Sequence, residues 1–337
     1  MALDLLTIIP HKVKSGIQGK MYLLYGGPKT NKTTTASKFP KPLILAAEMG
    51  YGLLDGVMAA PITSWVDVKN YLKQLKKPEV REMYETIVLD TVDIFWSLCE
   101  KFIKTQKDIE DLSELGYGRG YRAVRDEFQD TINSLGQMGY TLVFISHAEK
   151  KDYQDSVGVT HSGITPTLDK RPKEFISGLV DVMAFVCQEP DANGVNRPVA
   201  YLRGGKYGEI EIEAGSRYGE GLPRKIEFNY DELAKAIQSA DEAMLSSGVQ
   251  ISADNKTILE ATAEEQAAAK RTFAEVYQEA GGILDKLKAR IAGGETDLAE
   301  KVRTTIENYL GAGRKIQEAT PAQQDLVEAA IKDLKEL

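Results

Sequence analysis

Residues 26–36 read GGPKTNKTTTA, and this stretch decides the expected fold. It matches the phosphate-binding pattern G-x-x-x-x-G-K-[ST] except at Asn31, which stands where the second glycine belongs. An apolar run (MYLLYG, 21–26) precedes the loop and a helical stretch follows it, which is the context the pattern requires. Asn is one of the few residues besides glycine that enter the left-handed backbone region at low cost, so a nucleotide-binding loop is expected despite the substitution. The residues expected to bind the nucleotide are Gly26, Gly27, Pro28, Lys29, Thr30, Asn31, Lys32, Thr33 and Thr34.

Two side chains of the loop and one carboxylate farther along the chain predict the cofactors ATP and Mg²⁺. Lys32 would reach the β- and γ-phosphate oxygens, and the Thr33 hydroxyl would bind magnesium. Asp90 ends the apolar run TIVLD, where a carboxylate can hold Mg²⁺ through water. The metal-site prediction is therefore Thr33 and Asp90. The alternative is a strand-to-helix turn in which the glycines serve only geometry.

Hydrophobic patterning between residues 20 and 230 predicts an α/β core with a mainly parallel sheet flanked by helices. Expected strands are 21–26, 42–47, 86–90, 141–147, 180–188 and 198–204. The helix expected over 121–135 has apolar residues at Tyr121, Val124, Phe128, Ile132 and Leu135, which share one face. After residue 240 the sequence becomes rich in Ala, Glu, Lys and Leu. The predicted organisation is a core over 1–240, a linker over 241–256 and a helical region over 257–337.

Composition excludes several classes of protein. The chain has 337 residues, 42% of them hydrophobic and 27% charged, which is typical of a folded domain. Cys99 and Cys187 are expected to be small buried hydrophobes rather than a disulfide, and three histidines are too few and too scattered for a zinc cluster. The net charge is -8, and residues from Asp241 onward supply about -6 of it, so the core is near neutral. We expect no membrane partner and a cytoplasmic location.

Further polar residues follow the predicted strands. Glu48 closes the second strand and could orient or deprotonate water, and His147 ends the strand TLVFISH, where it could sense the γ-phosphate. A long polar stretch with little periodicity follows His147, and such stretches are usually functional. The alternative is an ordinary surface loop. The cationic and aromatic residues of the stretch, which become candidate DNA contacts through the family resemblance given next, are Lys150, Lys151, Tyr153, His161, Lys170, Arg171 and Lys173.

In the order of these parts the sequence resembles the RecA-type ATPase core. The segments GGPKTNKTT, IVLDTVD, GYRAVRDEF, FISHAEKKD and AGSRYGEGLPRKIEF are similar to phage-encoded RecA-like P-loop proteins of the single-strand annealing type. The resemblance covers about residues 18–238 and implies Glu48 as the catalytic base and His147 as the sensor. It also implies DNA-contacting loops at 148–158 and 159–174. Arg217 would be a cation offered to the nucleotide of a neighbouring subunit.

Two departures from this family affect turnover more than binding. Asn31 replaces the loop glycine, and Gly215 stands where the family's K-x-R has lysine, which leaves Arg217 alone. An arginine that acts in trans stabilises charge on the transferred phosphate, so the loss of its companion cation predicts slow ATP hydrolysis.

The leading hypothesis is an ATP-dependent single-stranded DNA-binding protein that promotes annealing or homologous recombination in a phage. Its expected partners are single-stranded DNA, further copies of itself in a ring or filament, and a single-strand-binding protein or another recombination protein at the C-terminal helices. The host location would be the bacterial cytoplasm. The alternative is a nucleotide-binding switch that hydrolyses little ATP and works through its helical tail. A small-molecule kinase ranks last because no arginine-rich lid is evident.

Overall fold

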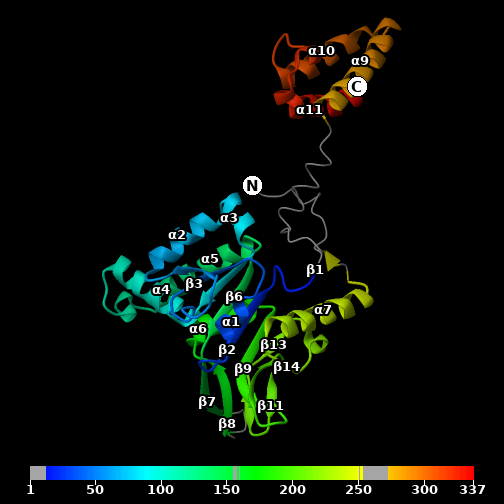
Figure 1. The fold of residues 1–337 in the computed structure, drawn as a ribbon. Coiled ribbons are helices and arrows are strands. Elements are labelled where there is room, and N and C mark those ends of the chain that lie inside the picture. Colours follow the sequence, from blue (N-terminus) through cyan, green and yellow to red (C-terminus); the bar gives the residue numbers. More distant parts are fainter. Residues whose placement is uncertain (1–12, 155–157, 159, 250, 253–271) are drawn as a thin grey trace. The chain divides into compact units, whose positions relative to one another are not determined.

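The computed structural model describes residues 13–154, 158, 160–249, 251–252 and 272–337. The chain divides into two compact units, one over Pro10–Thr257 and the other containing Ile258–Leu337. Figure 1 shows both units, and each is described separately below.

The larger unit is built on a nine-stranded sheet. The strands lie in the order β14 (Lys225–Glu227), β10 (Asn196–Tyr201), β9 (Val182–Pro190), β2 (Met21–Gly26), β6 (Thr141–Ser146), β5 (Thr86–Asp90), β3 (Pro42–Ala46) and β4 (Met58–Pro61), with β13 (Gly215–Ser216) paired to β9. The six neighbours from β9 to β4 are parallel, and β10 and β13 pair with β9 in the antiparallel direction. The expected mainly parallel sheet is therefore confirmed.

Helices cover both faces of this sheet, which explains why its strands read as continuous apolar runs. Leu23 and Tyr25 of β2 face a core with α2, α4, α5 and α6, whereas Tyr22 and Leu24 face a core with α1 and α7. The helices span α1 (Lys32–Ala36), α2 (Trp65–Leu75), α3 (Pro78–Met83), α4 (Val92–Lys107), α5 (Arg119–Gln137), α6 (Lys170–Leu179) and α7 (Tyr230–Ser246). The apolar face predicted for α5 is buried except at Tyr121, which is exposed.

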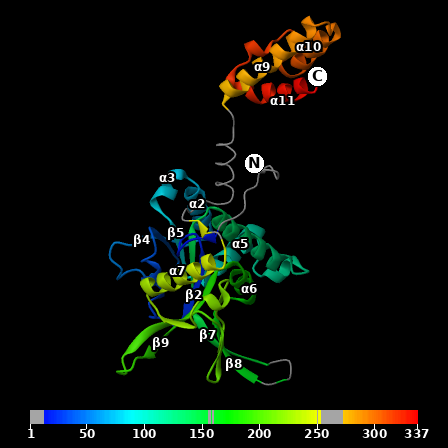
Figure 2. The same cartoon turned by 90° about the vertical axis from the view of Figure 1, so that its right-hand side faces the viewer.

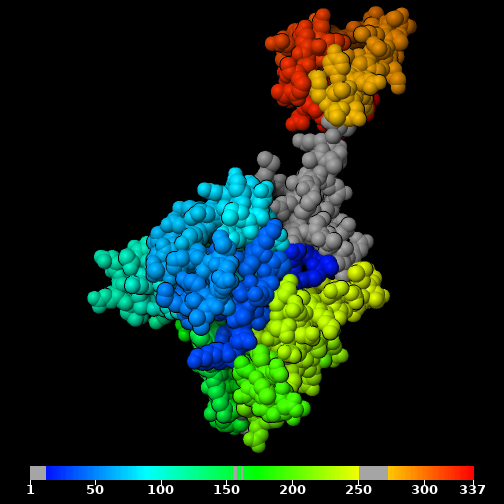
Figure 3. Space-filling model, viewed as in Figure 1, coloured from blue at the N-terminus to red at the C-terminus, as the bar shows by residue number. Residues whose placement is uncertain are grey.

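A second sheet of four strands replaces the two loops predicted after His147. It has the order β11 (Gly205–Tyr207), β12 (Ile210–Ile212), β8 (Thr160–Pro166) and β7 (Ala148–Gln154). The prediction of loops over 148–158 and 159–174 is wrong, because β7 and β8 form an antiparallel hairpin and residues 170–179 form α6. β7 and β8 are mostly polar, with Ala148 and Ile164 packed against the core, so they lack the regular alternation that identifies a half-buried strand. Figure 2 shows the hairpin projecting below the central sheet, and the green atoms of this region form the lower end of the larger unit in Figure 3.

The junction after the core also differs from the prediction. α7 continues to Ser246, so the expected linker, 241–256, begins inside a helix, and its residues 250 and 253–256 lie outside the described part. β1 (Val13–Lys14) pairs in parallel with β15 (Ile251–Ser252). The helix extends because Asp241 is buried, where it accepts hydrogen bonds from the Gly16 amide and the Tyr218 hydroxyl at 2.6 and 2.7 Å.

The smaller unit confirms the expected C-terminal helices. It contains α9 (Phe273–Ala292), α10 (Thr296–Leu310) and α11 (Gln324–Lys335), with short 3₁₀ turns η4 (Ile316–Glu318) and η5 (Pro321–Gln323). Its own apolar core includes Val276, Leu284, Ile306 and Ile331. Gly281 and Gly282, which resemble a break in the sequence, lie inside α9.

No helix in the described part of the chain is long and apolar enough to cross a membrane. Both cysteines are free thiols, with Cys99 buried and Cys187 half-buried.

Candidate active site

The loop between β2 and α1 has the backbone that the sequence pattern requires. Asn31 precedes α1 with φ 65° and ψ 19°, which is the left-handed conformation that glycine supplies in the unsubstituted pattern, and its side chain makes no capping hydrogen bond. Lys29 also has a positive φ of 60°. Alternation of left-handed residues with ordinary ones turns successive N–H groups toward one side, which creates a concave anion-binding surface. Asn31 therefore keeps the loop's geometry.

Lys32 lies folded against its own loop. Its ammonium donates hydrogen bonds to the carbonyl oxygens of Gly26 and Gly27, at 2.9 and 2.8 Å, and the residue is only 7% exposed. Burial lowers the pKa of this ammonium, against the pull of nearby carboxylates, among which Asp90 has the largest effect. A phosphate group would supply the negative charge that a buried ammonium needs, so the residue fits the γ-phosphate of ATP.

Thr33 and Asp90 form the expected oxygen pair for magnesium. The Thr33 hydroxyl donates to Asp90 Oδ2 at 2.7 Å, although 57 residues separate them. Strand order brings them together, because β6 pairs with β2 on one side and with β5 on the other, in registers that align Tyr25 with Ser146 and Ile145 with Asp90. Burial raises the pKa of the Asp90 carboxyl, partly offset by the Thr33 hydrogen bond.

This pair fits magnesium, which usually binds through one or two protein groups, water and the phosphates of its nucleotide. Within the described ranges no cluster of three or more His, Cys, Asp and Glu side chains could hold a metal ion by itself. The phosphates would therefore have to complete the coordination of the ion, and the ion would neutralise charge on the phosphate oxygens.

Glu48 is held in place beside this pair. Its Oε1 accepts a hydrogen bond from the Thr91 hydroxyl at 3.0 Å and lies 3.2 Å from His147 Nε2. The backbone amides of Ala47 and Glu48 donate to the carbonyl oxygen of Asp90 at 2.7 and 3.1 Å, which fixes the end of β3 against the end of β5. The side chains of Glu48 and His147 are 36% and 38% exposed, so water can reach the carboxylate. The arrangement suits a carboxylate that orients or deprotonates a water molecule.

Comparison with known proteins agrees with this geometry. A family model described as an AAA domain matches residues 18–218, which include the loop, Glu48, Asp90 and His147. The chain belongs to the AAA-domain family. It is therefore a P-loop domain of the ATP-binding type.

Two individual proteins resemble the chain. The SPbeta prophage-derived uncharacterized protein YorG of Bacillus subtilis (strain 168) is 29% identical over 343 residues, covering 100% of this chain and 99% of YorG. The KaiC-like protein PH0186 of Pyrococcus horikoshii OT3 matches 57% of this chain and 88% of its own, with 15% identity and a TM-score of 0.34.

Asp93 is a residue of the AAA domain that the sequence analysis missed. Its Oδ1 accepts hydrogen bonds from the hydroxyls of Ser146, at 3.1 Å, and Thr167, at 2.6 Å. Its buried Oδ2 has no hydrogen-bond partner in the described structure. The backbone amide of Thr167 also donates to the carbonyl oxygen of His147 at 3.0 Å, which closes the base of the β7–β8 hairpin. Asp93 thus joins the start of α4 to that base, and the repeated aspartate in LDTVD is the only sequence signal for it.

Arg217 does not belong to this chain's own nucleotide site. Ser216 pairs with Val182 at the start of β9, whereas Gly26 of the loop pairs with Val186 farther along the same strand. The Arg217 guanidinium donates to the carbonyl oxygens of Gly178 and Leu179, at 3.0 and 3.1 Å, at the end of α6. A catalytic role within its own subunit is therefore excluded by position, and the role in trans stays a prediction.

The predicted nucleic-acid contacts of the hairpin lie on β7 and β8. Lys150 and Lys151 are exposed on β7. Tyr153 and His161 are paired across the hairpin, but their side chains lie outside the described part.

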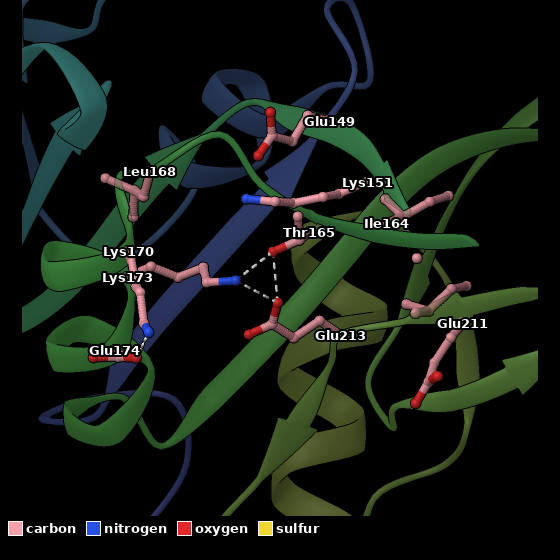
Figure 4. Close-up of a pocket in the computed structure, with 12 residues that line it drawn as sticks. Glu149, Lys151, Ile164, Thr165, Leu168, Lys170, Lys173, Glu174, Glu211 and Glu213 are labelled. Atoms are coloured by element: carbon pink, nitrogen blue, oxygen red, sulfur yellow. Dashed lines mark hydrogen bonds and ion pairs between the residues drawn. The ribbon is translucent and has the colours of Figure 1, made fainter. Parts of the chain in front are cut away.

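The other three predicted contacts lie in the first turn of α6 and differ in their surroundings. Lys173 donates to Thr165 Oγ1 at 2.8 Å and pairs with Glu213 at 3.1 Å, as Figure 4 shows. Its charge is therefore neutralised inside the unit, which makes it a poor phosphate ligand. Lys170 is exposed and 3.9 Å from Glu174, and the Arg171 guanidinium lies over the ring of Tyr121 at 4.8 Å.

Lys151, Lys170 and Lys173 line a cavity of about 430 Å³ between β7, β8, β12 and α6. Four glutamates line the same cavity, namely Glu149, Glu174, Glu211 and Glu213. The cavity thus has more acidic than basic side chains, which does not favour a phosphate backbone.

Proposed function

We propose that this AAA domain binds single-stranded DNA under the control of ATP and Mg²⁺ and promotes annealing or homologous recombination. The observation that carries the proposal is a surface where cations and exposed tyrosines alternate at the starts of α5 and α6. We call it the α5–α6 surface and define it by Tyr117, Arg119, Tyr121, Lys170 and Arg171.

The α5–α6 surface has the two components that a sequence-independent single-strand site needs. Tyr117 is 95% exposed, and the Arg119 guanidinium lies 5.9 Å from the centre of its ring. Arg171 lies over Tyr121 in the same way. Exposed aromatic rings stack with bases, and arginine and lysine neutralise phosphates. The ring of Tyr117 is therefore accessible to a base.

Hydrogen bonds attach the segment just before α6 to α4, the helix that follows Asp90 of the nucleotide site. The Trp96 indole N–H donates to Asp169 at 3.0 Å, and the Thr167 hydroxyl donates to Asp93, so the residues just before α6 are attached to α4. α4 itself begins two residues after Asp90. A change at the magnesium pair can therefore displace the start of α6, which supports control of DNA binding by the nucleotide.

Self-association belongs to the same proposal. Arg217 lies away from its own loop with its side chain 61% exposed, and its guanidinium is 3.5 Å from Asp181. Ion pairs of such exposed cations are weak, so the phosphates of a second copy can compete for this one. Mixing Lys32→Ala subunits with Arg217→Ala subunits tests this point. Mixed oligomers should regain part of the ATPase activity that each variant lacks alone, whereas no recovery would remove Arg217 from the mechanism.

DNA binding is tested by fluorescence anisotropy with labelled oligodeoxythymidylate, with and without Mg²⁺ and ATP. Arg119→Ala combined with Arg171→Ala should weaken binding and make the logarithmic salt slope shallower by about 1.4, at roughly 0.7 per lost phosphate contact. Tyr117→Ala should cost about 1–3 kcal/mol, the value of one stacked base. Lys32→Ala should keep the basal affinity and lose its dependence on ATP.

The matched control is Lys76→Ala with Lys77→Ala, which removes two exposed cations between α2 and α3. It should leave both the affinity and the slope unchanged. Equal affinity for single-stranded and duplex DNA, or an unchanged slope in the arginine variant, would reject the α5–α6 surface. ATP turnover that does not respond to DNA would then favour the alternative function, a nucleotide-binding switch that acts through its C-terminal helices.

A further inference from the structure

We propose that the C-terminal helical unit binds a short acidic segment of another protein through a groove between α9 and α10. The groove has a volume of about 590 Å³, within the usual range of ligand pockets. Each helix lines it with four residues at positions i, i+3, i+4 and i+7, which share one helix face, and no residue of α11 takes part. We call it the α9–α10 groove.

The floor of the groove is aliphatic. Leu287 and Ile306 are almost buried, at 5% and 9% exposure, while Ile291 and Val302 are half-buried. A groove with such a floor can take one or two large apolar side chains of a partner and remove them from water.

The rim of the groove is basic, although the unit is not. Lys288, Arg303, Arg314 and Lys315 line it against a single acid, Glu318. In contrast, residues 272–337 contain twelve Asp and Glu but nine Lys and Arg. The concentration of cations around the apolar floor is thus local, and it favours carboxylates beside the apolar side chains of the partner.

Two of the rim cations have acidic neighbours on their own helices, and these pairs are weak. Lys288 lies 3.2 Å from Asp285, with both side chains largely exposed, and Arg303 lies 3.9 Å from Glu307. Ion pairs at the protein surface contribute little to stability because water screens both charges, so a partner carboxylate can replace them at little cost. Arg314 and Lys315 are exposed in the segment between α10 and η4.

A peptide explains the groove better than a nucleic acid does. None of the residues that line it is aromatic, so it offers no ring on which a base could stack. Its aliphatic floor would remain uncovered beneath a phosphate backbone. The occupant that matches both floor and rim is a segment that combines aspartate or glutamate with leucine, isoleucine or phenylalanine.

The test uses the full-length protein and a fluorescein-labelled peptide in which aspartate alternates with leucine and phenylalanine, followed by anisotropy. Arg314→Glu with Lys315→Glu should weaken binding by about tenfold or more, because two attractive charges become repulsive. The matched control, Lys301→Glu with Lys332→Glu, makes the same charge change at exposed positions outside the groove and should bind within about twofold of the parent. Thermal melts of both variants check that the helices remain folded.

A second peptide separates recognition from simple charge attraction. Replacing its leucine and phenylalanine with serine should weaken binding by about tenfold or more, because the floor then has nothing to bury. Equal binding of the serine peptide, or unchanged binding of the first peptide to the rim variant, overturns the proposal. The proposal is also overturned if Arg314→Glu with Lys315→Glu abolishes oligodeoxythymidylate binding and leaves peptide binding unchanged. That result would identify the groove as a nucleic-acid site.

Discussion

Substitution of Asn31 tests whether conformation alone explains this residue in the nucleotide loop. Asn31 has φ 65°, and its side chain makes no capping hydrogen bond. The side chain should therefore affect stability only by how well it tolerates the left-handed backbone conformation. An ordinary L-residue in the left-handed region costs about 1–2 kcal/mol, and Asn less. Asn31→Ala should therefore lower the free energy of unfolding by about 1 kcal/mol. Asn31→Gly removes the strain, but glycine raises the conformational entropy of the unfolded chain, which lowers the free energy of unfolding by about 0.5–1 kcal/mol. The two effects oppose each other, so the net change in the free energy of unfolding should be small.

The same energy should appear in nucleotide affinity. If the alanine variant must regain the left-handed conformation in order to bind, about 1 kcal/mol corresponds to roughly fivefold weaker binding of Mg²⁺-ATP. Urea denaturation measures the first quantity and isothermal titration calorimetry the second. Asn133→Ala, an exposed position inside α5, is the matched control and should lose neither stability nor affinity. Equal effects of alanine and glycine at position 31 would refute the conformational explanation and assign the asparagine side chain a role of its own.

Three further outcomes follow from the structure. Glu48→Gln should bind Mg²⁺-ATP normally and lose most turnover in a phosphate-release assay, because an amide cannot take the proton of water; full turnover would place the base elsewhere. Burial raises the pKa of the Asp90 carboxyl, so the ionised carboxylate lowers the free energy of unfolding at neutral pH. This loss of stability disappears as the pH falls through the raised pKa, because the carboxyl becomes protonated in the folded protein. Asp90→Asn should therefore raise the melting temperature of the nucleotide-free protein at neutral pH and reduce the difference at mildly acidic pH; a lower melting temperature would contradict this sign. Truncation after Ser252 should leave a stable larger unit. Truncation after Ala240 removes Asp241, the ion-pair partner of the buried Lys20, and should lower the free energy of unfolding by about 3–5 kcal/mol. Equal melting temperatures of the two truncations would show that the end of α7 contributes nothing.

In the two proposals above, the α9–α10 groove and the α5–α6 surface would divide recognition between the two units of the chain. Basic residues beside tyrosines can bind the phosphates of a nucleic acid and stack with its bases. Basic residues beside aliphatic side chains can instead bind the carboxylates of a peptide and bury its apolar side chains. The two sites can therefore be impaired separately. A variant of one that changes ligand binding at the other would show that the units are coupled.

The sequence by itself determined the parts of this protein that depend on local physical chemistry. The strands 21–26 and 86–90 have the predicted bounds because parallel strands buried on both faces are continuous apolar runs with polar residues at their ends. Asn31 could be accepted in place of glycine because its backbone preference is a property of the single residue. Parallel strands also present their carboxyl ends at one edge of the sheet, so Glu48, Asp90 and His147 could be expected together before any distance was known.

Tertiary structure alone decided what depends on partners distant in the sequence. Lys173 is a plausible DNA contact in the sequence, but Glu213, forty residues later, neutralises it. The polar segment after His147 has no period that predicts strands. It forms β7 and β8, which pair with each other, and β8 also pairs with β12, which lies more than forty residues later in the sequence. Arg217 follows β13 and lies beside the start of β9, away from the loop, because β13 runs antiparallel to β9. In each case the deciding energy is a pairing between residues that only the folded chain brings together, and no local pattern encodes it.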